Sequence, residues 1–188
     1  MGKSASGKDH IYARLAAHEG LGLKKLVLYT TRPIRAEEEN GKQYYFVDDK
    51  KLEEFRSSGN LIEARAYHTV HGIWNYFTAD DGQVDLKNSD YLGIGTLESY
   101  VKLREYYGDD VMRPVYIQVE DGERLERALA REKTQENPKY EEMCRRFLAD
   151  QKDFSEENIL KAGIDKRFWN HNLDECVKEI GKYIKSIQ

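Results

Sequence analysis

Near its N-terminus the chain reads Gly2-Lys3-Ser4-Ala5-Ser6-Gly7-Lys8. This stretch fits the pattern G-x-x-x-x-G-K, in which glycines let backbone amides curl around phosphate oxygens and the lysine reaches the terminal phosphates. An amphipathic segment from Asp9 to His18 follows, so we expect a helix whose N-terminus adds a partial positive charge. The stretch predicts a phosphate-binding loop in an α/β domain. The plainer reading is a glycine-rich turn that binds nothing.

Two features next to this loop depart from the pattern. The residue after the lysine is normally Ser or Thr, whose hydroxyl holds Mg²⁺, and here it is Asp9. A carboxylate can also ligate Mg²⁺, which makes Asp9 the candidate metal ligand, but it brings a negative charge close to the phosphates. The pattern also calls for a preceding strand where only Met1 stands, so we expect the native chain to begin upstream of Met1.

The composition of the chain excludes several classes of protein. It has 188 residues with 30 Lys and Arg against 34 Asp and Glu, a net charge of −4, which argues against a nucleic-acid binder with a wide basic face. Thirteen Tyr, 6 Phe and 2 Trp supply core material, which argues against disorder. No apolar run is long enough to span a membrane, and the first residues lack the apolar segment of a secretory signal, so we expect none. Cys144 and Cys176 have no metal-ligand spacing, so we expect reduced thiols in a soluble cytoplasmic protein.

Strand and helix patterns alternate along most of the chain. We expect strands over residues 23–29, 44–47, 91–97 and 115–119, and helices over residues 50–58, 98–107 and 122–133. A last helix follows Asn172, a good N-cap, with Glu175 three residues on. The alternation predicts an α/β core with a parallel sheet, formed by residues 1–31 and 89–188. Residues 32–88 break the rhythm and are interpreted as an insertion with its own small sheet.

A second group of motifs lies in the predicted insertion and just before it. Arg32 and Arg35 are three residues apart, so their guanidinium groups can converge on one phosphate, to which Tyr44 can add a hydroxyl donor. The plainer reading is a solvated basic turn that the acidic run 37–39 neutralises. The motifs are, in order, Tyr29-Thr30-Thr31-Arg32-Pro33-Ile34-Arg35, then Glu38, Gly41, Tyr44-Tyr45-Phe46 and Leu61-Ile62-Glu63.

Together with the N-terminal loop, this series resembles the guanylate kinase family. The resemblance covers nearly the whole chain and is strongest from Gly2 to Glu63. It implies a P-loop NTPase-type parallel sheet flanked by helices, an inserted lobe over residues 32–88 that binds a nucleoside monophosphate, and a short lid over residues 131–145. It further implies a transferase that moves the γ-phosphate of MgATP to GMP or dGMP.

The resemblance also implies roles for individual residues. Donor phosphates are bound by Gly2, Ser4, Ala5, Ser6, Gly7, Lys8 and Asp9. GMP is bound by Arg32, Arg35, Tyr44, Glu63 and Thr96. The implied catalytic residues, which act on the transferring phosphoryl group, are Lys8, Arg131 and Arg146. The resemblance also implies that Asn170 lies near the adenine of the donor nucleotide.

The sequence departs from the family at positions where family members bind the guanine base. Leu28 replaces a serine, and Gly93 and Gly95 replace two aspartates, so Glu63 is left as the main base contact, with Thr96 as a partial substitute. Trp74 or Tyr76 takes the part of a family tyrosine. Two alternatives stay open: a kinase of another acceptor, such as AMP or a deoxynucleotide, and a non-catalytic module that binds a protein partner.

Overall fold

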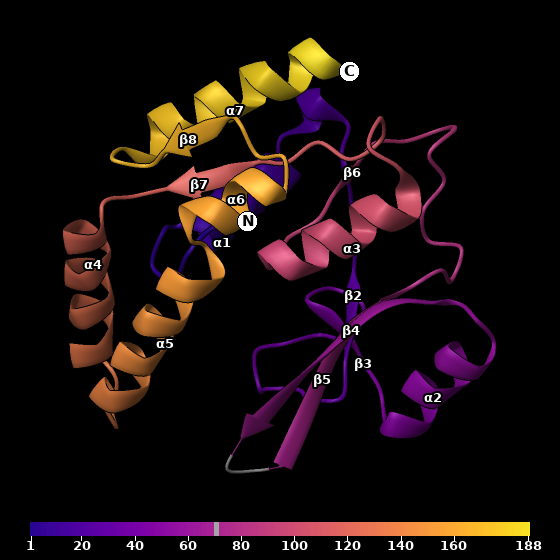
Figure 1. Cartoon of the computed structure of the whole chain (residues 1–188), viewed down its shortest axis with the longest axis horizontal. Coiled ribbons are helices and arrows are strands. Elements are labelled where there is room, and N and C mark those ends of the chain that lie inside the picture. The colour runs from indigo at the N-terminus through magenta and orange to yellow at the C-terminus, as the bar shows by residue number, and fades with distance from the viewer. Residues whose placement is uncertain (70–71) are drawn as a thin grey trace. The chain divides into compact units, whose positions relative to one another are not determined.

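The computed structural model describes residues 1–69 and 72–188, and these form two compact units. The first unit comprises Met1–Leu21, Ile94–Val101 and Arg113–Gln188, and the second comprises Gly22–Gly93 and Lys102–Met112 (Figure 1). Within the described ranges no helix is long and apolar enough to cross a membrane. His71, which with His68 forms a histidine pair in the sequence, lies outside the described residues.

The first unit consists of helices around two parallel strands. Strands β7 and β8 pair in parallel, with Ile117 opposite Phe168, and both of these side chains are buried. Gly2 adds a single parallel bridge to Ile117, so the chain just before the loop lies beside β7. The elements are α1 (Lys8–Ala16), η1 (Glu19–Leu21), the start of α3 (Leu97–Tyr107), β7 (Tyr116–Gln118), α4 (Asp121–Lys133), α5 (Tyr140–Asp153), α6 (Glu156–Lys161), β8 (Arg167–Trp169) and α7 (Leu173–Ile187).

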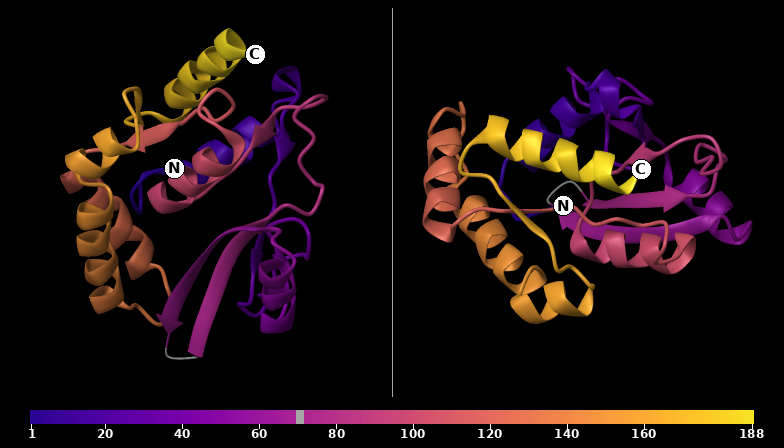
Figure 2. Two further views of the ribbon diagram at one scale, coloured as in Figure 1. Left: turned by 45° about the vertical axis from the view of Figure 1, so that its right-hand side comes forward. Right: turned by 90° about the horizontal axis from the view of Figure 1, so that it is seen from above.

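Helix α7 forms as its sequence pattern predicts. Its N-cap is Asn172, whose side chain accepts hydrogen bonds from the backbone N–H groups of Asp174 and Glu175. The residues at i, i+4 and i+8 on its apolar face, beginning with Cys176, are buried. This helix packs against α1, while α4 and α5 lie side by side in both views of Figure 2.

The second unit is organised around a four-stranded sheet in the order β3-β2-β5-β4. Strands β2 and β3 are parallel, and the other pairs in this sheet are antiparallel. The core of the unit packs Tyr29 against Phe77 with ring centroids 5.1 Å apart, and helix α2 covers them with Phe55. The elements are β1 (Lys24–Lys25), β2 (Leu28–Thr30), β3 (Tyr44–Phe46), α2 (Asp49–Ser57), β4 (Leu61–Thr69), β5 (Gly72–Ala79), β6 (Tyr91–Leu92) and the end of α3.

Two expected strands are wrong in extent. Residues 23–29 form two short strands, because the Gln83 side chain bonds both the N–H (2.9 Å) and the carbonyl (3.1 Å) of Val27 and so replaces a strand partner there. Strand β1 then pairs with β6, and β2 joins the larger sheet. The strand expected over 91–97 stops at Leu92, since Thr96 accepts a hydrogen bond from the Ser99 N–H at the start of α3.

Candidate active site

The Gly2–Lys8 loop has the tight backbone that its glycines predict. Gly7 has φ +81° and leads directly into α1. A Cβ on Gly2 would lie 2.7 Å from the Ile117 carbonyl oxygen, a distance that real side chains do not reach, so only glycine fits there. Ala5 also adopts a left-handed conformation, with φ +61°, which costs about 1–2 kcal/mol for a residue with a Cβ. The first N–H groups of a helix have no partners within the helix, so the end of this loop is suited to an anion.

Asn170 holds the loop from the end of β8. Its Nδ2 donates to the Ser6 carbonyl at 2.8 Å, and the residue is buried. A Cβ on Gly7 would lie 2.4 Å from the same nitrogen. Asn170 therefore supports the loop directly, while the contact with adenine expected from the sequence stays a prediction.

The arginines predicted to act on a phosphoryl group occupy different surroundings. Arg146, on α5, lies with its Nη2 3.4 Å from the Ser4 hydroxyl, so the structure brings it to the loop. Arg131 is exposed in the last turn of α4. Arg145, which precedes Arg146 on α5, instead donates two hydrogen bonds to the Glu142 carboxylate, each at 2.7 Å. Of the two predicted arginines, it is therefore Arg146 that contacts the loop in the part of the chain that the structure describes.

Lys8 and Asp9 stand side by side at the start of α1. The Lys8 Nζ lies 3.9 Å from an Asp9 carboxylate oxygen, and the Asp9 side chain is largely exposed. Among residues 1–69 and 72–188 no group of three or more His, Cys, Asp or Glu could hold a metal ion by itself. A single exposed carboxylate nevertheless fits Mg²⁺, because this ion is commonly held by one or two carboxylates together with phosphate oxygens of a nucleotide.

In the second unit, Arg32 is buried and held in a fixed orientation. Its two terminal nitrogens bond the carboxylate of Glu38 at 2.7 and 2.9 Å, and its guanidinium lies 5.8 Å from the ring of Tyr44. Hydrogen bonding from Arg32 holds the pKa of Glu38 below its ordinary value, although burial acts in the opposite direction. The ring of Tyr76 packs against that of Tyr44 at 5.5 Å, so Tyr76 is the aromatic residue of β5 beside this cluster. The Arg35 N–H donates to the same Glu38 carboxylate at 2.9 Å.

Glu63, the predicted base contact, is already engaged. Arg65 donates to both of its carboxylate oxygens, at 2.9 and 3.3 Å, and the Thr78 hydroxyl donates to one of them at 2.8 Å. The side chains of Glu63 and Arg65 are 2% and 9% exposed. Arg65 was not among the residues singled out from the sequence, although its position two residues after Glu63 on a strand places both on one face.

Thr96 and the two glycines near it lie outside the sheet that carries Glu63. Thr96 caps α3 through its hydroxyl and belongs to the first unit. A Cβ on Gly95 would lie 3.1 Å from the Ser99 hydroxyl, whereas one on Gly93 would make an ordinary contact with Leu26. Contact of Thr96 with a base stays a prediction.

Comparison with known proteins finds similarity to guanylate kinases. The family model described as Guanylate kinase matches residues 1–76. A guanylate kinase from Porphyromonas gingivalis is 27% identical over 184 residues, which cover 96% of this chain and 92% of that protein. The chain is thus similar to guanylate kinases over nearly its whole length. A guanylate kinase from Wolbachia pipientis is 37% identical, over 35% of its own length.

The guanylate kinase fold is also found by structural comparison. The crystal structure of guanylate kinase from Anaplasma phagocytophilum matches with a TM-score of 0.62 at 23% identity, covering 100% of this chain and 84% of that one. The likeness confirms the predicted α/β class, with a parallel-rich sheet flanked by helices. Within this guanylate kinase fold, sequence reasoning missed Arg65 and a buried cluster around Arg124, whose partners Asp121 and Asp150 lie 3 residues before and 26 after it.

Proposed function

We propose that this chain is an ATP-dependent nucleoside monophosphate kinase that converts ATP and GMP, or dGMP, into ADP and GDP or dGDP. The observation that carries the proposal is the Gly2–Lys8 loop, which Asn170 supports from one element while α5 brings Arg146 within 3.4 Å of Ser4. Such a loop with a nearby guanidinium suits phosphoryl transfer, which needs positioning and charge neutralisation more than covalent chemistry.

At the donor end, Lys8 and the backbone N–H groups at the start of α1 would bind the ATP phosphates. Arg146, together with Arg131 across the 134–139 loop, would neutralise charge that develops on the transferring group, and we propose that this loop is the lid. Asp9 would hold Mg²⁺ jointly with phosphate oxygens. When bound, the ion supplies further neutralisation of the phosphate charge.

At the acceptor end, the second unit would act as the monophosphate-binding lobe, with residues 32–88 as its main part. Arg32, Arg35 and Tyr44 would bind the acceptor phosphate. Glu38 fixes the Arg32 guanidinium in advance, so little side-chain freedom is left to lose on binding. No general base is required, because a phosphate monoester is already largely a dianion at neutral pH.

The pairing of Glu63 with Arg65 favours a second candidate, a kinase of broader acceptor range. Guanine offers N–H donors, and the carboxylate that would accept them is already occupied by Arg65 and Thr78. Reading guanine through Glu63 therefore requires Arg65 to give up at least one of its bonds. A base-binding site whose polar side chain already has hydrogen-bond partners within the protein discriminates less against other bases. We also propose a cytoplasmic location, as expected for free thiols such as Cys144 and Cys176.

The test is a coupled assay of ADP release with MgATP and a panel of GMP, dGMP, AMP, CMP and UMP. Turnover confined to the guanine acceptors supports the first proposal, and comparable turnover of another monophosphate supports the second candidate. Lys8→Met should abolish turnover, whereas Lys178→Met, an exposed lysine on α7, makes the same charge change and should leave it intact. Absence of turnover with every acceptor would overturn the kinase assignment.

A further inference from the structure

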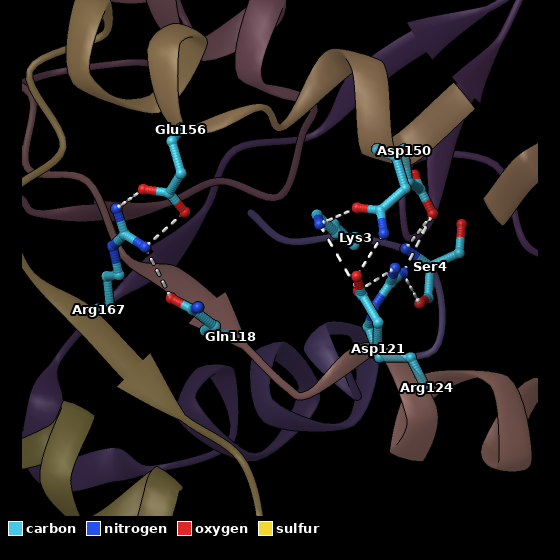
Figure 3. Close-up of polar contacts among 9 residues, drawn as sticks. Lys3, Ser4, Gln118, Asp121, Arg124, Asp150, Glu156 and Arg167 are labelled. Carbon is cyan, nitrogen blue, oxygen red and sulfur yellow. Dashed lines mark hydrogen bonds and ion pairs between the residues drawn. The ribbon is translucent and has the colours of Figure 1, made fainter. Parts of the chain in front are cut away.

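A buried charge cluster contacts the Gly2–Lys8 loop at a point that the proposed mechanism does not use. At its centre is Arg124 of α4, which is 1% exposed (Figure 3). Its Nη1 donates to the Ser4 carbonyl at 3.0 Å, and its Nη2 and Nε donate to Asp121 at 2.8 and 3.1 Å. The guanidinium also lies 4.7 Å from the ring of Phe147 on α5. A buried arginine is costly unless its donors are satisfied, and here its partners are the loop backbone and carboxylates.

The other backbone group of Ser4 is held from α5. The Ser4 N–H donates to Asp150 Oδ2 at 2.7 Å, and the same oxygen lies 3.5 Å from Arg124 Nη1. The backbone carbonyl and N–H of Ser4 are thus bonded by Arg124 and Asp150, two oppositely charged side chains that also pair with each other. In this arrangement the Ser4 N–H is occupied by a carboxylate and the Ser6 N–H donates to the Lys3 carbonyl at 3.2 Å, which leaves the amide of Ala5 and those from Gly7 onward to meet a phosphate.

The cluster extends to the neighbouring loop residue. Lys3 bonds the Gln151 side chain, which in turn bonds Asp121, and the Lys3 Nζ also lies 3.6 Å from Asp121. Although burial raises the pKa of Asp121, hydrogen bonds from Arg124 and Gln151 hold it below the ordinary value, so the carboxylate stays ionised.

The location of this cluster relates it to the lid. Asp121 and Arg124 lie in the first turn of α4, and Asp150 and Gln151 lie in the last turn of α5, so both pairs sit at the root of the helical hairpin whose tip is the 134–139 loop. Asp150 follows Arg146 by four residues, which places the two on one face of α5. The bond from Ser4 to Asp150 therefore also sets the position of Arg146 relative to the loop.

We propose that Arg124 and Asp150 are positioning residues that clamp the Gly2–Lys8 loop at Ser4 to both helices of the lid hairpin, and so set the affinity for the triphosphate donor. The proposal rests on the proposed function in taking ATP as the ligand. Neither residue needs to touch the nucleotide. Each acts through Ser4 and, in the case of Asp150, through the placement of Arg146.

The test measures MgATP binding by isothermal titration calorimetry, together with KM for each substrate. Asp150→Ala removes the acceptor of a charge-assisted hydrogen bond, so we expect MgATP affinity to fall by about tenfold or more and the acceptor KM to stay within about twofold. Asp150→Asn keeps an acceptor oxygen and should recover most of that loss. Arg124→Lys keeps the positive charge but loses the guanidinium that bonds Asp121 and the Ser4 carbonyl together, so it should lower MgATP affinity as much as Asp150→Ala does.

The matched control is the ion pair of Glu156 with Arg167, in the same unit and also drawn in Figure 3. It joins α6 to β8, and Arg167 additionally contacts Gln118 rather than the loop. Glu156→Ala should leave MgATP affinity unchanged, even if thermal stability falls. A thermal unfolding curve for every variant separates lost stability from lost affinity.

Several results would overturn the clamp. These are MgATP affinity in Asp150→Ala equal to that of Glu156→Ala, tighter binding in Asp150→Ala, or an equal loss of affinity for donor and acceptor. If Asp150→Ala does not fold, Arg124→Lys decides by the same criteria. Because MgATP binding is measured directly, the clamp can be confirmed or refuted even if no acceptor is turned over, an outcome that would refute the proposed function alone.

Discussion

The buried pair of Glu63 and Arg65 gives the sharpest prediction about stability. Replacing Arg65 by Met keeps much of the side-chain volume but removes the charged partner of the Glu63 carboxylate, which is 2% exposed and also accepts from the Thr78 hydroxyl. Breaking a buried ion pair from one side costs about 3–5 kcal/mol, because an uncompensated charge stays in a desolvated site. We therefore expect Arg65→Met to lower the free energy of unfolding by about that amount. Glu63→Gln should cost less than Arg65→Met, since the amide still offers an oxygen to the guanidinium.

The assay is urea unfolding followed by tryptophan fluorescence. The chain has two tryptophans, Trp74 in the second unit and Trp169 in the first, so a Trp169→Phe background makes the signal report on the unit that contains the pair. The double variant Glu63→Leu with Arg65→Met removes both charges and should be more stable than Arg65→Met alone. As a control, Glu54→Gln breaks an exposed pair with Lys51 and should cost less than about 1 kcal/mol. A loss below about 1 kcal/mol in Arg65→Met, or a double variant less stable than Arg65→Met, would refute the reasoning.

Three further predictions concern single residues. Gly7→Ala should lower the free energy of unfolding by at least about 1–2 kcal/mol and weaken MgATP binding, because the left-handed backbone disfavours a Cβ and that Cβ would clash with Asn170 Nδ2. An unchanged urea midpoint and affinity would contradict this prediction. Ellman's reagent at about pH 8 should label Cys144 in the folded protein and Cys176 only after unfolding. Cys176 is protected because burial raises the pKa of its thiol to about 11. Mass spectrometry identifies the labelled site. Arg32 lowers the pKa of Glu38, so the stability that this pair supplies is present above the unfolded pKa near 4.5 and is lost as the pH falls through the folded pKa. The urea midpoint of the unchanged protein should therefore drop more steeply between about pH 6 and about pH 3 than that of Glu38→Gln. Parallel pH dependences of the two midpoints would contradict this prediction.

The features predicted correctly from the sequence are those with local causes. Gly7 is required by the left-handed backbone of the loop itself, and Asn172 caps α7 through hydrogen bonds from the second and third residues after it. The apolar face of α7 follows from helical spacing alone. For the same reason the boundaries of α2 and α4 were predicted to within one residue.

The features that sequence reasoning missed depend on partners far along the chain. The strand expected over residues 23–29 is interrupted by a side chain 56 residues away, that of Gln83. The clamp on Ser4 joins residues separated by 120 and 146 positions, and nothing in the local sequence of α4 or α5 marks Arg124 or Asp150 as paired with the loop. Charged helix residues are usually solvated, so their burial could not be predicted without knowing the packing.

The supports of the Gly2–Lys8 loop also determine when it can acquire its structure during synthesis. The loop precedes in the chain all the residues that hold it, because its contacts come from Ile117, Arg124, Asp150 and Asn170. The second unit, by contrast, is complete once Met112 has emerged. Since domains generally fold as units during translation, the second unit should fold first, while the nascent loop waits through most of elongation for the segment that holds it in place. A chain stalled before Asn170 would then carry a folded second unit and an unsupported Gly2–Lys8 loop, a target for chaperones and proteases.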